Sequence, residues 1–312
     1  MTFKNVPKPL NLLKFHRPRL RLNEARIPPL SQQSKQCLRN LTAYRRPDID
    51  IPVPRGRTAG VLVALFVGRK GDLYVLLNRR STNLRTYAGD TSLPGGKAEP
   101  DDRTIEDTAV SRREAFEEHQ QIGLPPDRQK VPLLCILEPF VAGNATIVTP
   151  VVVLILDNTL RPILNDAEVA SLFSHPLASF LSTKPPFPAE PYHSYNDWTS
   201  PGPNDTTWTT RSHRFLTGRE AGGIKPVFGL TANIMIRVSM IAYGHPPEFD
   251  IYPPDIDTPT LKTRLAWAML SRPQLREACQ KEGLQVDWDR LRRIAGVKED
   301  TKVQKKDPQT KF

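Results

Sequence analysis

The 312-residue sequence has few cysteines, and their shortage excludes several kinds of site. Cys37, Cys135 and Cys279 lie far apart and form no Cys-x-x-Cys or Cys/His spacing. Neither a disulfide framework nor a zinc site is indicated, and a reducing compartment is the simplest interpretation. Long hydrophobic runs are also missing. The longest, from Thr146 to Leu156, is too short for a membrane span and contains a proline, so it predicts a buried strand and we expect no membrane span.

Acidic residues are outnumbered, and none occurs before Glu24. Lys and Arg number 44 against 33 Asp and Glu, which gives a net charge of +11. This balance favours polyanionic partners, such as phosphorylated small molecules, nucleic acid or an anionic membrane surface. The basic N-terminus is compatible with a mitochondrial presequence, but its prolines favour a disordered arm over an import helix.

Hydrophobic patterning predicts alternating strands and helices. The apolar run at 58–68 and the alternating run at 73–80 enclose the turn RKGD, which predicts a β-hairpin. Further strands are expected in KVPLLCIL and IVTPVVVLILD. Helices are expected in KQCLRNLTAYR, residues 104–121, DAEVASLFSHPLASFL, residues 228–244, LKTRLAWAML and QLREACQKEG.

Composition divides the chain into three parts. We expect a basic, disordered arm at 1–34, one globular domain at 35–260, and a helical extension with a charged, disordered tail at 261–312. Within the domain, residues 183–208 are rich in proline, aromatic and small polar residues, and they predict a long surface insertion.

Three glutamates lie close together in RREAFEEHQQIGL, residues 112–124. On a helix, Glu114 and Glu118 stand on one face with Glu117 beside them. Like charges at this spacing destabilise an isolated helix, so they need a compensating cation. Two interpretations stay open: a solvated face with ion pairs such as Arg113 with Glu117, or a hard divalent metal.

The loop before this helix favours the metal. LPGGKAEPDD, residues 93–102, brings two glycines, a lysine and further carboxylates to the start of the same helix. Mg²⁺ and Mn²⁺ bind through a few acidic groups and the substrate's phosphates, and glycines let the backbone approach those phosphates. Such a site can hydrolyse phosphoanhydrides by holding an activated water in line with the phosphorus atom.

These residues resemble the Nudix box, G-x5-E-x7-R-E-U-x-E-E-x-G-U, in which U is a bulky aliphatic residue. The stretch LLNRRSTNLRTYAGDTSLPGG, residues 76–96, is similar to the signature of the coenzyme A diphosphatase subfamily, LLTxR(S/A)x3Rx3GxxxFPGG, and differs at Asn78 and Leu93. Weaker similarity extends from Leu38 to Gly244. The resemblance implies an α/β fold: a Nudix-type α/β/α sandwich with a mixed sheet, in which the glutamate helix and the helix at 228–244 cover opposite faces.

Two features depart from the Nudix pattern. Counted from Gly96, the Arg-Glu pair arrives late, at Arg113 and Glu114, so the loop is longer than the box and the approach of the carboxylates within 99–102 to the metal is undefined. In addition, HQQ at 119–121 follows the last glutamate. Three residues rotate a helix by about 300°, so it can lengthen by almost a turn and leave in nearly the same direction.

The resemblance implies a role for each matching residue. Glu114 and Glu118 are the expected metal ligands, and Glu117 is a further ligand or orients the attacking water. Arg113 is expected to hold the glutamates by ion pairing, so Glu117 and Arg113 are the expected catalytic residues. Guanidinium groups suit phosphate binding. The residues expected to bind substrate are Arg80, Arg85, Lys97, Gly95 and Gly96.

The expected reaction is hydrolysis of the pyrophosphate of coenzyme A or an acyl-CoA, which gives 3',5'-ADP and 4'-phosphopantetheine or its acyl form, with Mg²⁺ or Mn²⁺ as cofactor. Glu168 is a distant candidate for the general base, although we interpret it as a charge at a helix N-terminus. Two rival functions stay open. One is Nudix hydrolysis of another dinucleotide or of capped RNA, which the basic termini favour; the other is a non-catalytic binding or scaffold protein. A small-molecule substrate is favoured over nucleic acid.

The compartment is predicted from the same features. The resemblance suggests a peroxisome, the expected lack of a membrane span is compatible with the cytoplasm, and the basic N-terminus suggests a mitochondrion.

Overall fold

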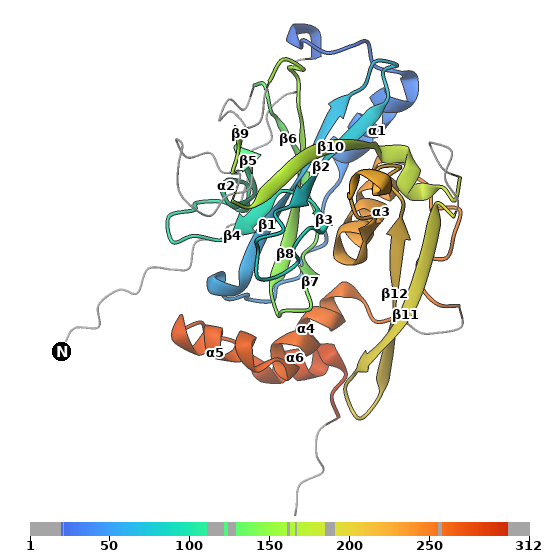
Figure 1. Ribbon diagram of the computed structural model, residues 1–312. Coiled ribbons are helices and arrows are strands. Elements are labelled where there is room, and N and C mark those ends of the chain that lie inside the picture. The colour runs from blue at the N-terminus through green and yellow to red at the C-terminus, as the bar shows by residue number, and fades with distance from the viewer. Residues whose placement is uncertain are drawn as a thin grey trace, which may run out of the picture.

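A mixed β-sheet forms the centre of the molecule in the computed structural model, which describes residues 20, 22–110, 122–123, 129–160, 163–165, 167–184, 191–254 and 258–298. The strand order is β10-β2-β1-β8-β6 (Figure 1). β1 and β8 are parallel, whereas the other neighbours on this path are antiparallel. The five strands are β1 (Thr58–Val67), β2 (Leu73–Arg80), β6 (Leu133–Ile136), β8 (Ile147–Leu154) and β10 (Val169–Pro176).

The central strands follow the predicted hydrophobic runs. Every residue of β8 is buried, which is expected for a strand covered on both faces. β1 and β2 form the predicted hairpin: the Gly68 amide donates to the Asp72 carbonyl at 2.8 Å, and Gly71 has a φ of 81°, a conformation that favours glycine. The three cysteines are buried, and none of them forms a disulfide.

Helices cover both faces of the sheet, and this confirms the predicted α/β/α sandwich. α1 (Gln32–Ala43) and α3 (Gly229–Tyr243) belong to the larger core cluster on one face. α2 (Ile105–Val110) packs through Ile105 and Ala109 in a separate cluster with β1, β6 and β8. The helices expected on opposite faces thus lie as predicted over the part of each that the structure describes.

Within the arm expected at 1–34, residues 22–31 pack on the larger core ahead of α1. Ser31 caps α1 by accepting a hydrogen bond from the Ser34 amide at 3.1 Å. The Arg26 amide donates to the Leu156 carbonyl at 2.8 Å, and several apolar side chains of this segment pack on the larger core. Burial of these side chains explains why the segment folds despite its basic, proline-containing sequence.

Two segments have a different structure from the one predicted. Residues 169–176 were expected to be helical but form β10, which pairs with β2 along its length. The apolar spacing in this segment fits a helix, but pairing with a sheet edge satisfies its backbone and buries Phe173 and His175. The next residues continue as a short 3₁₀ helix, η3 (Leu177–Leu181).

The second difference concerns the predicted surface insertion. Much of it forms a hairpin of β11 (His193–Pro201) and β12 (Thr207–Phe215), and β12 also pairs with β13 (Val227–Phe228). Threonine and aromatic residues favour strands, and Asn204 and Asp205 both have a φ near 55–60°, as in the tight turns that close hairpins. Pro201 ends β11, Pro203 lies in the turn, and Pro191 precedes β11.

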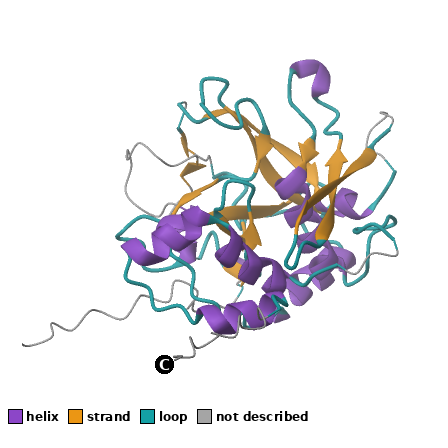
Figure 2. Ribbon diagram, turned by 90° about the horizontal axis from the view of Figure 1, so that it is seen from below, coloured by secondary structure: helices purple, strands orange, loops and turns teal. Residues whose placement is uncertain are grey.

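Three C-terminal helices build a second core below the sheet (Figure 1, Figure 2). They are α4 (Leu261–Ser271), α5 (Pro273–Lys281) and α6 (Trp288–Ala295), of which the sequence had predicted the first two. Their buried side chains pack against Ile49, Ile51, Ala145 and Ile147. The helical extension is therefore continuous with the rest of the molecule through apolar packing.

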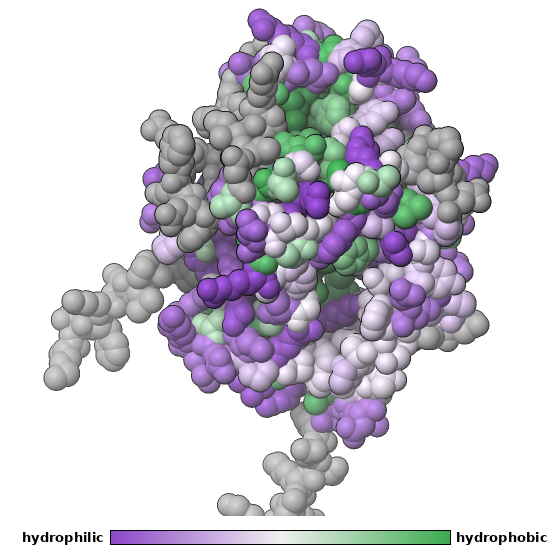
Figure 3. Space-filling model, in the orientation of Figure 1, coloured by the Kyte–Doolittle hydropathy of each residue, from purple (hydrophilic) through white to green (hydrophobic). Residues whose placement is uncertain are grey.

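The face of the molecule seen in Figure 3 is mainly hydrophilic, with hydrophobic residues gathered toward its centre. Among the described residues, no helix is long and apolar enough to cross a membrane. The short elements are η1 (Leu22–Glu24), η2 (Arg55–Arg57), β3 (Thr91–Ser92), β4 (Gly95–Lys97), β5 (Ile122–Gly123), β7 (Phe140–Val141), β9 (Ile163–Leu164) and η4 (Glu220–Gly222).

Candidate functional site

The predicted Gly-Gly pair lies in β4, which pairs with the start of β1. On one side of β1, β2 pairs with Leu65–Val67 at the end of the strand. This leaves Ala59–Val61, near its start, to pair with β4. A Cβ atom at Gly95 would lie 2.3 Å from the Gly60 carbonyl oxygen, which is closer than any side chain can approach. A Cβ atom at Gly60 would lie 2.9 Å from the Ala109 amide nitrogen of α2. Glycine at both positions lets α2, β1 and β4 approach one another closely.

The loop after β4 is held by buried polar contacts. The Asp102 side chain is only 4% exposed, and its Oδ2 accepts hydrogen bonds from the Glu99 amide at 2.9 Å and from Thr108 Oγ1 at 2.8 Å. The Arg55 guanidinium donates to the carbonyl oxygens of Glu99 and Asp102, at 2.6 Å for the latter. These hydrogen bonds of Asp102 and Arg55 organise the loop.

The same loop ends in a reciprocal helix cap. Thr104 Oγ1 accepts from the Asp107 amide at 3.1 Å, and Asp107 Oδ2 accepts from the Thr104 amide at 2.9 Å. The predicted start of the glutamate helix near Thr104 is thereby confirmed. The residues predicted to hold and position the metal, Arg113, Glu114, Glu117 and Glu118, lie outside the described residues.

A cavity of about 720 Å³ lies beside β4, a volume typical of small-molecule sites. It brings together four of the five residues predicted to bind substrate, and Arg85 is not among those that line it. Arg85 is exposed in the loop between β2 and β3, whose neighbouring residues do reach the cavity. The predicted residues that line it are Arg80, Gly95, Gly96 and Lys97.

Two glutamates also line this cavity. Glu99 lies in the loop after β4, and Glu168 directly precedes β10. The sequence interpretation of Glu168 as a helix N-terminal charge is wrong, because the chain continues there as a strand. Glu168 instead lines a cavity that Arg80 and Lys97 also line.

The cavity includes side chains that sequence reasoning did not select. Asn144 comes from the turn between β7 and β8, and Leu230 and Ile234 come from α3. The aromatic residues Tyr87 and Phe228 also line it. Tyr87 occupies an unspecified position of the coenzyme A diphosphatase signature, and Phe228 was expected only as the first residue of a helix. No local pattern therefore marked either one.

The described residues form no group of three or more His, Cys, Asp or Glu side chains able to hold a metal ion. The residue types that line the cavity nevertheless suit a hard divalent cation and phosphate, because they include the carboxylates Glu99 and Glu168 and the cations Arg80 and Lys97. The predicted Mg²⁺ or Mn²⁺ site rests on Glu114, Glu117 and Glu118.

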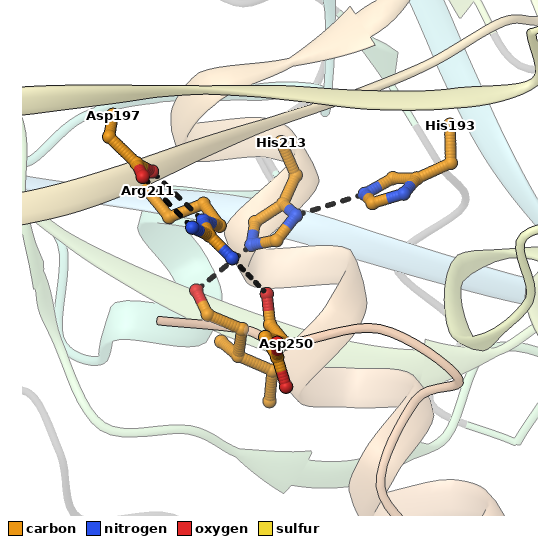
Figure 4. Close-up of polar contacts among 6 residues, drawn as sticks. His193, Asp197, Arg211, His213 and Asp250 are labelled. Atoms are coloured by element: carbon orange, nitrogen blue, oxygen red, sulfur yellow. Dashed lines mark hydrogen bonds and ion pairs between the residues drawn. The ribbon is translucent and has the colours of Figure 1, made fainter. Parts of the chain in front are cut away.

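A second polar cluster joins the β11–β12 hairpin to the chain near residue 250 (Figure 4), and none of its labelled residues lines the cavity. His193 Nε2 and His213 Nδ1 are 3.0 Å apart, and His213 Nε2 is 3.0 Å from the Ile251 carbonyl oxygen. Arg211 donates to both carboxylate oxygens of Asp197, at 2.8 and 2.9 Å. Burial, with the nearby charges of His213 and Arg211, lowers the pKa of His193 to about 4. The cluster therefore contains neutral histidines at pH 7.

Comparison with known families identifies one domain. The model of the NUDIX domain matches residues 56–196, which include β4, its loop and the cavity residues on β1, β2 and β8.

Comparison with curated proteins gives relatives from three compartments. Nudix hydrolase 22, chloroplastic, of Arabidopsis thaliana is 32% identical over 231 residues, covering 72% of this chain and 69% of that protein. Nudix hydrolase 15, mitochondrial, of the same plant is 35% identical over 196 residues, covering 62% of this chain and 61% of its own length. A peroxisomal coenzyme A diphosphatase of Mus musculus is 32% identical over 192 residues, covering 61% of this chain and 72% of that protein. The match thus spans about three fifths of the mitochondrial relative.

Proposed function

Because this chain belongs to the Nudix hydrolase family, we propose that it hydrolyses the pyrophosphate bond of coenzyme A or an acyl-CoA. The products are 3',5'-ADP and 4'-phosphopantetheine or its acyl form. One observation carries the proposal: Arg80 and the Gly95–Lys97 strand, which lie at the two ends of the coenzyme A diphosphatase signature, line the same cavity. The mouse relative, whose name describes this activity, supports the choice of substrate.

Different residues bind the substrate and transfer the proton. Arg80 and Lys97 bind the negative charges of the pyrophosphate, and β4 presents its backbone beside them. Arg113 holds the glutamates at 114, 117 and 118 by ion pairing. A divalent cation, when bound by these glutamates, neutralises phosphate charge and lowers the pKa of a water molecule. Glu168, at the cavity wall, accepts a proton from the attacking water or orients it.

Product analysis of coenzyme A incubated with the protein and Mn²⁺ tests the reaction. We expect the wild type to release 3',5'-ADP, and Glu118→Gln to be at least about a hundredfold slower, a loss of about 2.7 kcal/mol of transition-state stabilisation. The matched control is Asp289→Asn, which removes a carboxylate from the exposed Asp289–Arg292 pair on α6 and should leave the rate unchanged. Bound metal without cleavage of coenzyme A would exclude this substrate, and a panel of dinucleotides and capped RNA would then identify the right one.

The role of Glu168 has its own test. We expect Glu168→Gln to lower kcat by about a hundredfold with KM changed little, because proton transfer typically contributes a factor of this size. The rate of the variant should also depend less on pH on the acidic side of the optimum. A rise in KM at constant kcat would show instead that Glu168 only contacts the substrate.

A further inference from the structure

Two large aromatic side chains are exposed at the edge of the cavity. Tyr87 is 56% exposed and Phe228 is 41% exposed, and both line the cavity. Among the described residues, the other large hydrophobic side chains with comparable exposure are Tyr195, Trp198 and Tyr252, which do not line it. Single exposed aromatics are common, but two at one cavity with basic residues indicate a binding surface.

Hydrogen bonds tie the two segments that carry these rings. Lys225 Nζ donates to the Ala88 carbonyl at 3.1 Å and to Asp90 Oδ1 at 2.6 Å. Thr91 Oγ1 donates back to the Lys225 carbonyl at 2.5 Å. The loop that carries Tyr87 is thereby fixed to the chain three residues before Phe228.

The backbone at each of these residues is also held in place. Phe228 pairs with Arg214 of β12 and immediately precedes α3. Tyr87 has a φ of 57°, a left-handed conformation that bulky residues rarely adopt. Its backbone is held by the Asp90 amide, which donates to the Tyr87 carbonyl at 3.2 Å. A backbone that is already held in place loses little further entropy when a ligand binds to the side chains it carries.

The chemistry around the rings defines the class of ligand. Arg80 and Lys97 line the same cavity, and Arg80 Nε has no hydrogen-bond partner in the described part of the chain. Guanidinium and ammonium groups attract phosphates, whereas aromatic rings stack on the face of a planar base. The cavity therefore offers both parts of a phosphorylated nucleoside a matching surface.

We propose that Tyr87 and Phe228 form the nucleobase subsite, at which the base of the substrate stacks on an aromatic ring while its phosphates lie toward Arg80 and Lys97. The proposal rests on the proposed function, for which the base is the adenine of coenzyme A. Tyr87 and Phe228 are thus specificity-determining residues that contact the substrate away from the bond that breaks.

Fluorescence of 1,N6-etheno-coenzyme A in EDTA, which prevents turnover, measures stacking directly. We expect the wild-type protein to quench the probe. Tyr87→Asn and Phe228→Leu should each bind it at least about tenfold more weakly, because stacking on an aromatic side chain contributes about 1–3 kcal/mol per base. Asparagine tolerates the left-handed backbone at position 87, so strain does not explain a loss there.

Matched controls separate stacking from folding. Tyr87→Phe keeps the ring and should quench like the wild type. Trp198→Leu removes an exposed aromatic residue outside the cavity and should have no effect. Inorganic pyrophosphate has no base, so the two test variants should bind it as the wild type does.

These experiments can overturn the nucleobase subsite and the proposed reaction independently of each other. No quenching by the wild type, or undiminished binding by both Tyr87→Asn and Phe228→Leu, would overturn the subsite even if Mn²⁺-dependent release of 3',5'-ADP is observed. Quenching that depends on the two rings, without release of 3',5'-ADP, would support the subsite and overturn the reaction.

Discussion

Gly95 shows how one residue type can serve the fold and the site together. The resemblance assigned it to the loop that surrounds the substrate's phosphates, and the structure adds that its missing side chain lets β4 lie against β1. Any Cβ atom at this position would meet backbone rather than a movable side chain, so the neighbouring strand has to shift.

Gly95→Ala should therefore lower the free energy of unfolding by about 1–3 kcal/mol, the usual cost of overpacking. We also expect activity to fall, because Gly96 and Lys97 shift with the strand. Urea unfolding and the rate of coenzyme A hydrolysis measure the two effects.

The control for this substitution is Gly143→Ala, at a second glycine that lines the same cavity. A Cβ atom there has no neighbour within 4 Å. Stability should change by less than about 0.5 kcal/mol, as for other surface substitutions. Equal destabilisation by both changes would mean that the close approach at Gly95 is not what makes glycine necessary.

At the scale of elements, Arg55 connects the C-terminal helices with the loop after β4. Glu282, at the end of α5, accepts hydrogen bonds from the Arg55 and Gly56 amides, each at 2.7 Å. The Arg55 side chain then donates to carbonyl oxygens at both ends of the Glu99–Asp102 turn. The position of this turn therefore depends on the packing of α5.

Arg55→Ala should loosen the turn and lower kcat/KM for coenzyme A by about tenfold, a typical effect of about 1.4 kcal/mol for hydrogen bonds from a charged group. Faster amide hydrogen exchange at residues 99–102 would show that loosening directly. Arg45→Ala, at an exposed arginine that donates only to neighbouring carbonyls, is the control and should leave both measurements unchanged. An unchanged exchange rate in Arg55→Ala would exclude a positioning role.

The histidine cluster of the β11–β12 hairpin should make the stability of the folded protein depend on pH. The pKa of His193 is about 4 in the folded protein, below the ordinary value of 6.5, so the unfolded chain binds a proton at a higher pH than the folded one. Stability is therefore lost as pH falls from 6.5 toward 4. For this one half-buried group, solvent screening reduces the loss between pH 7 and pH 5 to about 1 kcal/mol.

His193→Phe should reduce this dependence. The ring of His193 stacks on Phe249 with centroids 4.0 Å apart, so phenylalanine retains a contact there while removing the titrating group. Urea unfolding at pH 7 and pH 5 should show a smaller difference for the variant than for the wild type. The same difference in both proteins would mean that His193 does not titrate abnormally.

Elements with strong periodicity and clear boundaries were predictable from sequence. The β1–β2 hairpin, β8, α1, α3 and the start of α2 follow from apolar runs and caps that act locally. β10 was not predictable in this way, because its conformation depends on pairing with β2, which lies almost a hundred residues earlier. In the site, Arg80 and Lys97 were found through a motif, whereas Phe228 reaches the cavity only through the tertiary fold.

At the scale of the whole molecule, the C-terminal helices complete a core that the sheet begins. Ile49, Ile51, Ala145 and Ile147 are buried with residues of α4 to α6. The C-terminal region also holds the turn between β7 and β8, because Arg272 Nη1, between α4 and α5, donates to the Gly143 carbonyl at 2.6 Å. The cavity wall at this turn thus depends on the C-terminal region.

A chain truncated after residue 260 should expose these side chains. Each fully buried isoleucine contributes about 1.5–3 kcal/mol, so we expect a loss of several kcal/mol and a lower melting temperature. Binding of 8-anilinonaphthalene sulfonate would report the exposed apolar surface. A truncated chain with the melting temperature of the full-length protein would show that the second core adds nothing to stability.

The β11–β12 hairpin limits how segments can be exchanged between members of the family. The family match ends at residue 196, inside β11, whereas the hairpin continues to α4 through bonds from Arg264 to Thr210 and from Trp267 to Pro201. A chimera with its crossover at that boundary would combine half a strand from one parent with a partner strand from the other. Crossovers that keep β11, β12 and the C-terminal helices from the same parent preserve these contacts, so the segment to exchange extends beyond residues 56–196, which match the NUDIX domain.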